Sequence, residues 1–380
     1  MLSKPTTTLH AAIPPAAKLA NITLAALATV AGMSGAVQAQ STVSVTGTID
    51  LGARHTRNSV GALKSLSSGN SSTSVLMFRG SEDMGGGLLA SFWLESSIFA
   101  DTGTVGSLTL TPTGQFFDRR STVSLQNQWG ELRLGRDWNP VFLGYVYSDP
   151  FFAVGVGSTA NFLNASVNTV YTRAFGNAAF PTTISRVNNA VEYHLPANLG
   201  GVNGQLMLGA GEGNNGNGGF KYSGGRLGYR DGGVDVSAYA SSTHIDAQAA
   251  DLKQAGLAGS YKTGALRVSA SYTQTTFLSS KQNHYLLGAT YTVGAGNIKL
   301  SYNNMDQQGT GSTGASIAAN DARQFGLGYE HYLSKRTVLY GNAGRLNNSG
   351  AAKFAIPGGP AGVAGGSSST GYELGMRHSF

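Results

Sequence analysis

Much of this chain alternates apolar and polar side chains one residue at a time. The run Leu266–Tyr272 (LRVSASY) is one example. Because successive side chains of a strand point to opposite faces of its sheet, such a segment has one apolar and one polar face. Beyond the first 40 residues, no apolar run approaches the roughly 20 residues that a membrane-spanning helix needs. The pattern is typical of a transmembrane β-barrel, although a soluble β-sandwich alternates in the same way.

Sixteen segments qualify as strands, an even number, as in single-chain bacterial barrels. Each is close to the ~9–11 residues that a tilted strand needs to cross the hydrocarbon layer. The connections alternate between short turns and long loops, which places the turns at one end of the barrel and the loops at the other. The expected strands are 41–54, 71–80, 88–98, 117–127, 131–137, 185–195, 202–212, 220–230, 234–243, 253–262, 265–275, 282–292, 297–305, 321–331, 336–346 and 370–380.

Residues 1–39 are typical of a secretory signal peptide. Lys4 and Lys18 supply positive charge, the run LANITLAALATVAG is apolar, and Val37–Ala39 offers small residues at a cleavage point. The mature chain is then expected to be one domain, 40–380. The last strand carries apolar residues on one face and ends on the aromatic Phe380. A secretory signal together with this ending favours the outer-membrane barrel over the sandwich.

The composition excludes several classes of function. The chain has no cysteine, so it has no disulfide framework, thiolate metal site or cysteine nucleophile. The seven histidines are scattered without metal-ligand spacing, and no motif predicts a cofactor. The formal net charge is only +7 and forms no basic patch interleaved with aromatic residues, so a nucleic-acid partner is not expected.

One segment, 138–183, interrupts the regular pattern. It has no clear periodicity, is far longer than the ~12–15 residues beyond which loops are uncommon, and is rich in aromatic residues. Strands carrying Arg133 and Arg186 flank it. We expect this segment to fold into the barrel and narrow its interior.

Several stretches resemble the general porins of β-proteobacteria, the trimeric diffusion porins of Gram-negative bacteria. The segment Arg79–Leu88 (RGSEDMGGGL) carries the most specific likeness. The others are Ser44–Gly52, Phe117–Leu125, Trp129–Arg136, Arg186–Tyr193 and the ending Gly375–Phe380.

The resemblance implies a sixteen-stranded antiparallel barrel, a homotrimer in the cell outer membrane, and an inward-folded third external loop facing a cluster of arginines. Such a protein is a water-filled channel for passive diffusion of small hydrophilic solutes and ions, weakly preferring anions, and does no chemistry. One departure is conspicuous: members of the family often carry a basic residue where this chain has Val75.

Strand parity selects the candidate residues of the pore. Leu132 and Leu134 are expected to face lipid, so Arg133 faces inward, and the same reasoning turns Arg186 inward. Parity favours Arg120 in its strand, whereas the family comparison favours Arg119, and both are kept.

Asp137 and Asp149 are the expected acids on the side of the constriction loop, opposite these arginines. Two alternatives remain open: an outer-membrane barrel enzyme, such as a protease or lipase, and an adhesin with a closed lumen.

Overall fold

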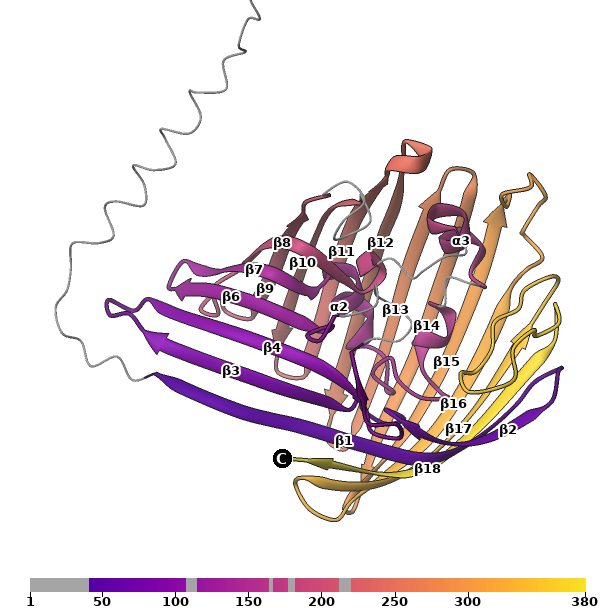
Figure 1. Cartoon of the computed structure of the whole chain (residues 1–380), viewed down its shortest axis with the longest axis horizontal. Coiled ribbons are helices and arrows are strands. Elements are labelled where there is room, and N and C mark those ends of the chain that lie inside the picture. Colours follow the sequence, from indigo (N-terminus) through magenta and orange to yellow (C-terminus); the bar gives the residue numbers. More distant parts are fainter. Residues whose placement is uncertain (1–40, 107–114, 164–166, 177–181, 212–219) are drawn as a thin grey trace, which may run out of the picture. The chain divides into compact units, whose positions relative to one another are not determined.

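The strands of the chain form one antiparallel sheet that closes on itself (Figure 1). This computed structural model describes residues 41–106, 115–163, 167–176, 182–211 and 220–380. The expected signal peptide, 1–39, lies outside the described residues, so it stays a prediction.

The strands follow the expected segments to within a few residues at most ends. Among the described residues, no helix is long and apolar enough to cross a membrane. The strands are β1 (Thr42–Arg57), β2 (Ala62–Ser68), β3 (Val75–Asp83), β4 (Leu89–Phe99), β5 (Thr104–Val105), β6 (Arg120–Asn127), β7 (Gly130–Trp138), β8 (Arg186–His194), β9 (Val202–Gly209), β10 (Lys221–Asp231), β11 (Val234–Ile245), β12 (Ala250–Thr263), β13 (Leu266–Phe277), β14 (Ser280–Val293), β15 (Gly296–Gly309), β16 (Ala322–Tyr332), β17 (Thr337–Asn348) and β18 (Ser368–Ser379). The helices are α2 (Pro140–Val146) and α3 (Thr169–Phe175), with single 3-10 turns η1 (Thr159–Phe162), η2 (Thr182–Ile184) and η3 (Asp246–Gln248).

The sheet closes where β1 pairs with β18, from Thr48 opposite Ser379 to Arg57 opposite Thr370. The terminal residue takes part as well, because Phe380 and Gly47 exchange two backbone hydrogen bonds of 3.0 Å. A closed barrel leaves no unpaired strand edge, which is the condition for placing a sheet in lipid.

Seventeen of these elements form a ring of sixteen strands within the described part of the chain, as expected. β2 and β3 count as one strand, because β2 pairs with the second half of β1 and β3 with its first half. The short β5 pairs only with the end of β4. The prediction missed β2, which lies in the connection expected at 55–70.

A buried carboxylate explains the break between β2 and β3. Asp50 is fully buried and accepts hydrogen bonds from the backbone N–H groups of Asn70, Ser71 and Ser72. These bonds hold residues 69–74 as a turn inside the ring.

The two faces of the ring differ as the alternation predicts. Leu132, Val191 and Leu266 lie on the outer face, with 38%, 46% and 37% of their surface exposed. Asn303, Gln307 and Gln324 are buried inside the ring. Apolar side chains therefore cover the outer face of the barrel, and polar side chains line its interior.

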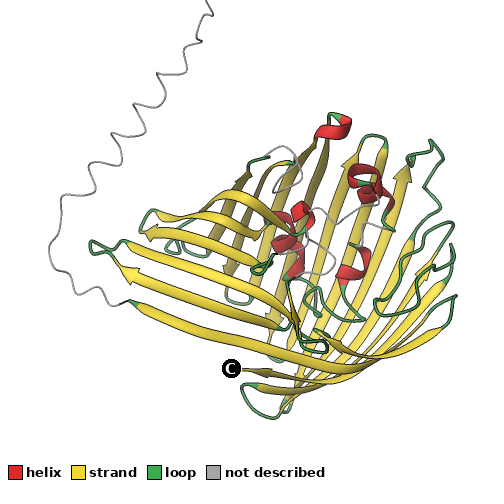
Figure 2. Ribbon diagram, viewed as in Figure 1, coloured by secondary structure: helices red, strands yellow, loops and turns green. Residues whose placement is uncertain are grey.

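The segment between β7 and β8 runs from 139 to 185, close to the expected 138–183, and contains two short helices. Asn139 caps α2 by accepting a hydrogen bond from the N–H of Phe142, and Pro140 follows at the first helical position. Asn168 caps α3 in the same way, accepting from Tyr171. Figure 2 shows both helices within the enclosure of strands.

These helices place an apolar core inside the ring, between the inserted segment and one wall. Val141, Tyr145 and Val146 of α2 pack with Tyr239 of β11 and Ala258 of β12. A second cluster joins α3 to β11, β12 and β13 through Val170, Tyr171, Ala174, Ile245, Leu252 and Phe277. The expected inward folding of this segment is what the structure has.

Candidate functional site

The inserted segment leaves a cavity between itself and the opposite wall. This constriction cavity has a volume of about 610 Å³. Its charged lining consists of three arginines, Arg54, Arg119 and Arg186, and one acid, Glu95. The segment 139–185 turns mostly apolar side chains and backbone toward the cavity, namely Phe142, Val146, Phe152, Ala153, Val154 and Leu163.

Arg119 lies just before β6 and is compensated by Glu95 of β4. Its Nε donates a hydrogen bond to the Glu95 carboxylate, and its backbone N–H donates to the Glu95 carbonyl over 3.2 Å. Glu95 was visible in the alternation of its strand but was not predicted as a site residue.

Arg186, the first residue of β8, is not compensated by an acid. Among the described residues, no carboxylate oxygen lies within 4.0 Å of its guanidinium. Its side chain stands 5.4 Å from the centre of the Trp138 ring, and its Nε is buried without a hydrogen-bond partner. Only 8% of the residue is exposed. Arg186 therefore brings an unneutralised positive charge to the cavity.

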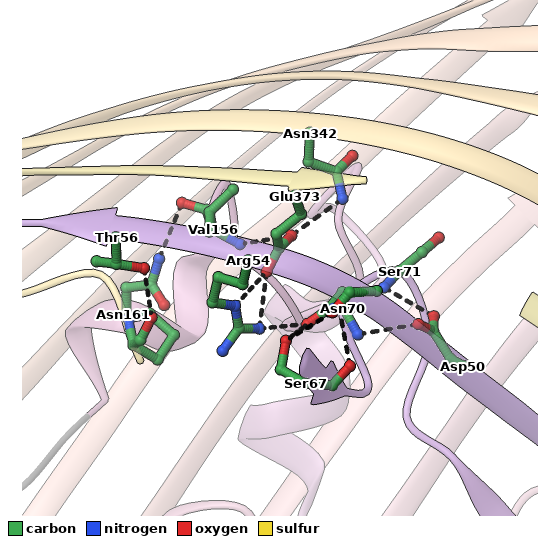
Figure 3. Close-up of polar contacts among 12 residues, drawn as sticks. Asp50, Arg54, Thr56, Ser67, Asn70, Ser71, Val156, Asn161, Asn342 and Glu373 are labelled. Carbon is green, nitrogen blue, oxygen red and sulfur yellow. Dashed lines mark hydrogen bonds and ion pairs between the residues drawn. The ribbon is translucent and has the colours of Figure 1, made fainter. Parts of the chain in front are cut away.

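Arg54 of β1 was missed by the prediction, although the parity of β1 turns it inward together with Asp50. Figure 3 shows it at the centre of a polar network. Its Nε donates to Glu373 of β18 over 2.8 Å, and its terminal nitrogen donates to Asn70. Glu373 in turn accepts hydrogen bonds from the backbone N–H of Val156 and from the side chain of Asn342. One buried carboxylate thus holds both a cavity arginine and the inserted segment.

Arg120 and Arg133 do not belong to the constriction cavity. They line a second pocket toward the short-turn end of the ring and are ion-paired there. Arg133 lies 2.6 Å from Asp137 and 2.9 Å from Glu131, and Arg120 lies 3.2 Å from Asp137. The four predicted arginines therefore form two groups, Arg119 with Arg186 and Arg120 with Arg133.

The alternatives Arg119 and Arg120 both lie inside the ring. Arg120 is the first residue of β6 and follows the alternation of that strand. Arg119 comes before β6, so the alternation does not determine its direction. The adjacent β7 carries a register irregularity between Gly135 and Asp137 where it pairs with β8.

The two predicted acids are not placed as expected. Asp137 is a residue of β7, on the wall beside Arg120 and Arg133, and not part of the inserted segment. Asp137 has the same parity as Arg133 in β7 and therefore lies on the same face of the strand. It therefore neutralises the basic wall from within and does not face it across the cavity.

Asp149 lies on the inserted segment but is only 3% exposed. Its carboxylate accepts hydrogen bonds from the backbone N–H groups of Phe151, Ala153 and Thr159. Burial raises the pKa of this carboxyl, and the three N–H donors act in the opposite direction. Asp149 thus organises the tip of the segment, and a carboxylate bonded within its own turn does not face the arginines across the cavity as expected.

Side chains of β13, β15 and β16 hydrogen-bond the inserted segment to the wall on the side away from the constriction cavity. Ser269, Ser301 and Gln324 donate hydrogen bonds of 2.6–2.8 Å to the carbonyls of Ser148, Gly157 and Ser158. Glycines allow the approach: a Cβ on Gly344 would lie 2.1 Å from the Val156 carbonyl oxygen. The width of the cavity therefore depends on contacts on the side away from it.

Val75, where the family resemblance implies a basic residue, lines the constriction cavity and is 7% exposed. The departure noted in the sequence thus removes a charge from the cavity itself. No group of three His, Cys, Asp or Glu side chains in the described ranges could hold a metal ion.

Comparisons with known proteins agree with this architecture. A family model described as Gram-negative porin matches residues 23–351. Outer membrane porin protein 32 of Delftia acidovorans is 36% identical over 94% of this chain and 99% of its own length. An outer membrane porin of Bordetella pertussis is 25% identical over 84% of this chain and 92% of its own length.

A solved porin structure has the same fold. The anion-selective porin from Comamonas acidovorans superposes with a TM-score of 0.75 at 35% identity, covering 90% of this chain and all of that one.

Proposed function

The chain belongs to the family of Gram-negative porins, and on that premise we propose that it passes small anions in preference to cations, with Arg186 as the main source of the preference. The chain is an outer-membrane channel for the passive diffusion of small hydrophilic solutes and ions. The proposal concerns which ions it favours and which residues decide this.

The observation that carries the proposal is the unequal compensation of the three arginines of the constriction cavity. Arg54 is paired with Glu373 and Arg119 with Glu95, whereas Arg186 has no carboxylate within 4.0 Å among the described residues. A confined cavity lined by low-dielectric walls concentrates the field of such a charge and raises the local concentration of anions. The anion selectivity of the Comamonas acidovorans structure supports the same sign.

The test is the reversal potential of reconstituted channels across a KCl gradient. We expect the wild-type channel to favour chloride, and Arg186→Gln to lose most of that preference. The matched control is Arg336→Gln, which removes the same charge from an exposed turn. Low ionic strength sharpens the comparison, because the Debye length is ~10 Å at 0.1 M salt and shortens as salt increases. A wild-type channel without anion preference, or equal potentials in the two variants, would contradict the proposal.

We also propose that the channel is a homotrimer that catalyses no reaction. The resemblance of Arg79–Leu88 to the trimeric diffusion porins supports the first part, and membership in a family of channels supports the second. Native mass spectrometry in detergent should show three chains. A monomer, or turnover in a panel of peptide and ester substrates, would contradict the respective part.

A further inference from the structure

A second pocket of the lumen lies toward the short-turn end of the barrel and shares no lining residue with the constriction cavity. Its volume is about 320 Å³. We name it the Trp93 pocket, after the indole in its lining. Its charged side chains are Arg79, Arg120 and the ion pair of Arg133 with Glu131, and hydroxyl side chains such as Ser44, Ser81 and Thr122 also line it. In the proposed conduction, an anion that has passed Arg186 meets this pocket next.

The order of the strands brings Arg79 and Arg120 to the indole ring of Trp93. β4 lies between β3 and β6, and in the register Trp93 of β4 is opposite Arg79 of β3 on one side and Thr122 of β6 on the other. The guanidinium carbon of Arg79 lies 3.4 Å from the centre of the indole, and that of Arg120 lies 4.0 Å from it. Cation–π attraction holds both side chains flat and fixes the direction of their N–H donors.

The two arginines differ in charge compensation. Arg120 has Asp137 at 3.2 Å. Arg79 has no carboxylate within 4.0 Å in the part of the chain that the structure describes; its terminal nitrogen contacts only the sulfur of Met77, at 3.2 Å. A stacked arginine without an acid keeps its full charge for a ligand.

Donors in this pocket also lack acceptors. The Nε of Arg79 and the Nε1 of Trp93 are both buried and have no hydrogen-bond partner. Buried donors are satisfied in nearly all native structures, so two unsatisfied ones beside an uncompensated cation indicate a place for an acceptor. The ligand that fits this set carries negative charge and several oxygen atoms.

We infer that the Trp93 pocket is a second anion-binding station of the channel, selective for small oxyanions such as inorganic phosphate or a carboxylate. Arg79 supplies the charge and planar donors that match such oxygens, and the surrounding hydroxyl groups supply further donors. The inference rests on the proposed channel function, but it concerns a site separate from the constriction cavity.

The chain offers a direct readout, because it has three tryptophans and one of them is Trp93. In a Trp129→Phe, Trp138→Phe background, the remaining fluorescence reports on the pocket. We expect the anion iodide to quench Trp93 more strongly than its exposure to neutral acrylamide would predict, and phosphate to protect it. Arg79→Gln should lower iodide quenching severalfold and abolish the protection, while acrylamide quenching stays the same. Arg336→Gln serves as the matched control.

Several outcomes separate the possibilities. Equal iodide quenching in Arg79→Gln and Arg336→Gln, or no protection by phosphate, would overturn the site. Arg79→Lys keeps the charge and should retain part of the protection, which guards against a folding defect in the glutamine variant. Protection by acetate as well as phosphate assigns the pocket to carboxylates and inorganic oxyanions alike. The reversal potential of the wild-type channel separates failure of this site from failure of the proposed function, since lost anion preference counts against the latter whatever the fluorescence shows.

Discussion

At the scale of single residues, the net charge of the pore depends on which of its arginines are ion-paired with a carboxylate. Arg54, Arg119 and Arg186 all line the constriction cavity, but Glu373 and Glu95 neutralise the first two. Arginine does not lose its proton in proteins, so only a neighbouring acid can remove its effect on a passing ion. The acids therefore determine the selectivity as much as the arginines do.

Glu95→Gln should increase the anion preference, because it frees the charge of Arg119. A unit charge at about 4 Å acts with ~1 kcal/mol in a water-like medium, attracting chloride and repelling potassium, so the chloride-to-potassium permeability ratio should rise about fivefold or more. Reversal potentials in a KCl gradient measure this ratio. Glu82→Gln on the exposed end of β3 is the matched control. An unchanged or lowered ratio in Glu95→Gln would show that Glu95 does not screen Arg119.

At the scale of elements, the inserted segment 139–185 sets the width of the pore. Contacts with the strands on the side away from the cavity fix its position. Ser269, Ser301 and Gln324 hold its backbone against the wall, and glycines of the strands leave room for it. The width of the pore thus depends on side chains that do not line the constriction cavity.

Gly344→Ala should reduce the single-channel conductance, because the added Cβ would meet the Val156 carbonyl oxygen at 2.1 Å and push the segment into the cavity. Gly341→Ala on the same strand is the matched control, since its nearest neighbours are 3.8 Å away. We expect the control to conduct as the wild type does. Equal currents from both variants would place the pore-limiting contact elsewhere.

The sequence predicts the strands well, because the period of two is a local property of the chain. It placed Leu132 outside and Arg133 inside for that reason. It assigned Asp137 to the side of the constriction loop, although Asp137 is a residue of β7 with the parity of Arg133 and is ion-paired with Arg133 and Arg120. It also missed the pairing of Arg54 with Glu373, since β1 and β18 meet only when the ring closes. Partners separated by most of the chain cannot be inferred from alternation.

At the scale of the whole molecule, the polar interior and the apolar exterior are two faces of the same strands. Polar side chains such as Asn303 and Gln324 are buried inside, whereas Leu134 and Leu374 are exposed on the outside. The dry core that the described residues contain lies between the inserted segment and two parts of the wall, β11–β13 and β15–β17. The rest of the interior is left for water and for whatever the channel passes.

The central claim is that the cavity beside the inserted segment is the conducting path. The absence of native cysteine makes a single introduced thiol unambiguous. Ala160→Cys places it on η1 at the constriction cavity, and Leu134→Cys places it on the outer face. The measurement is the current through single reconstituted channels during exposure to a charged, water-soluble thiol reagent. The account predicts a stepwise loss of current in Ala160→Cys and none in Leu134→Cys; an unchanged current in Ala160→Cys, with modification confirmed by mass, would contradict it.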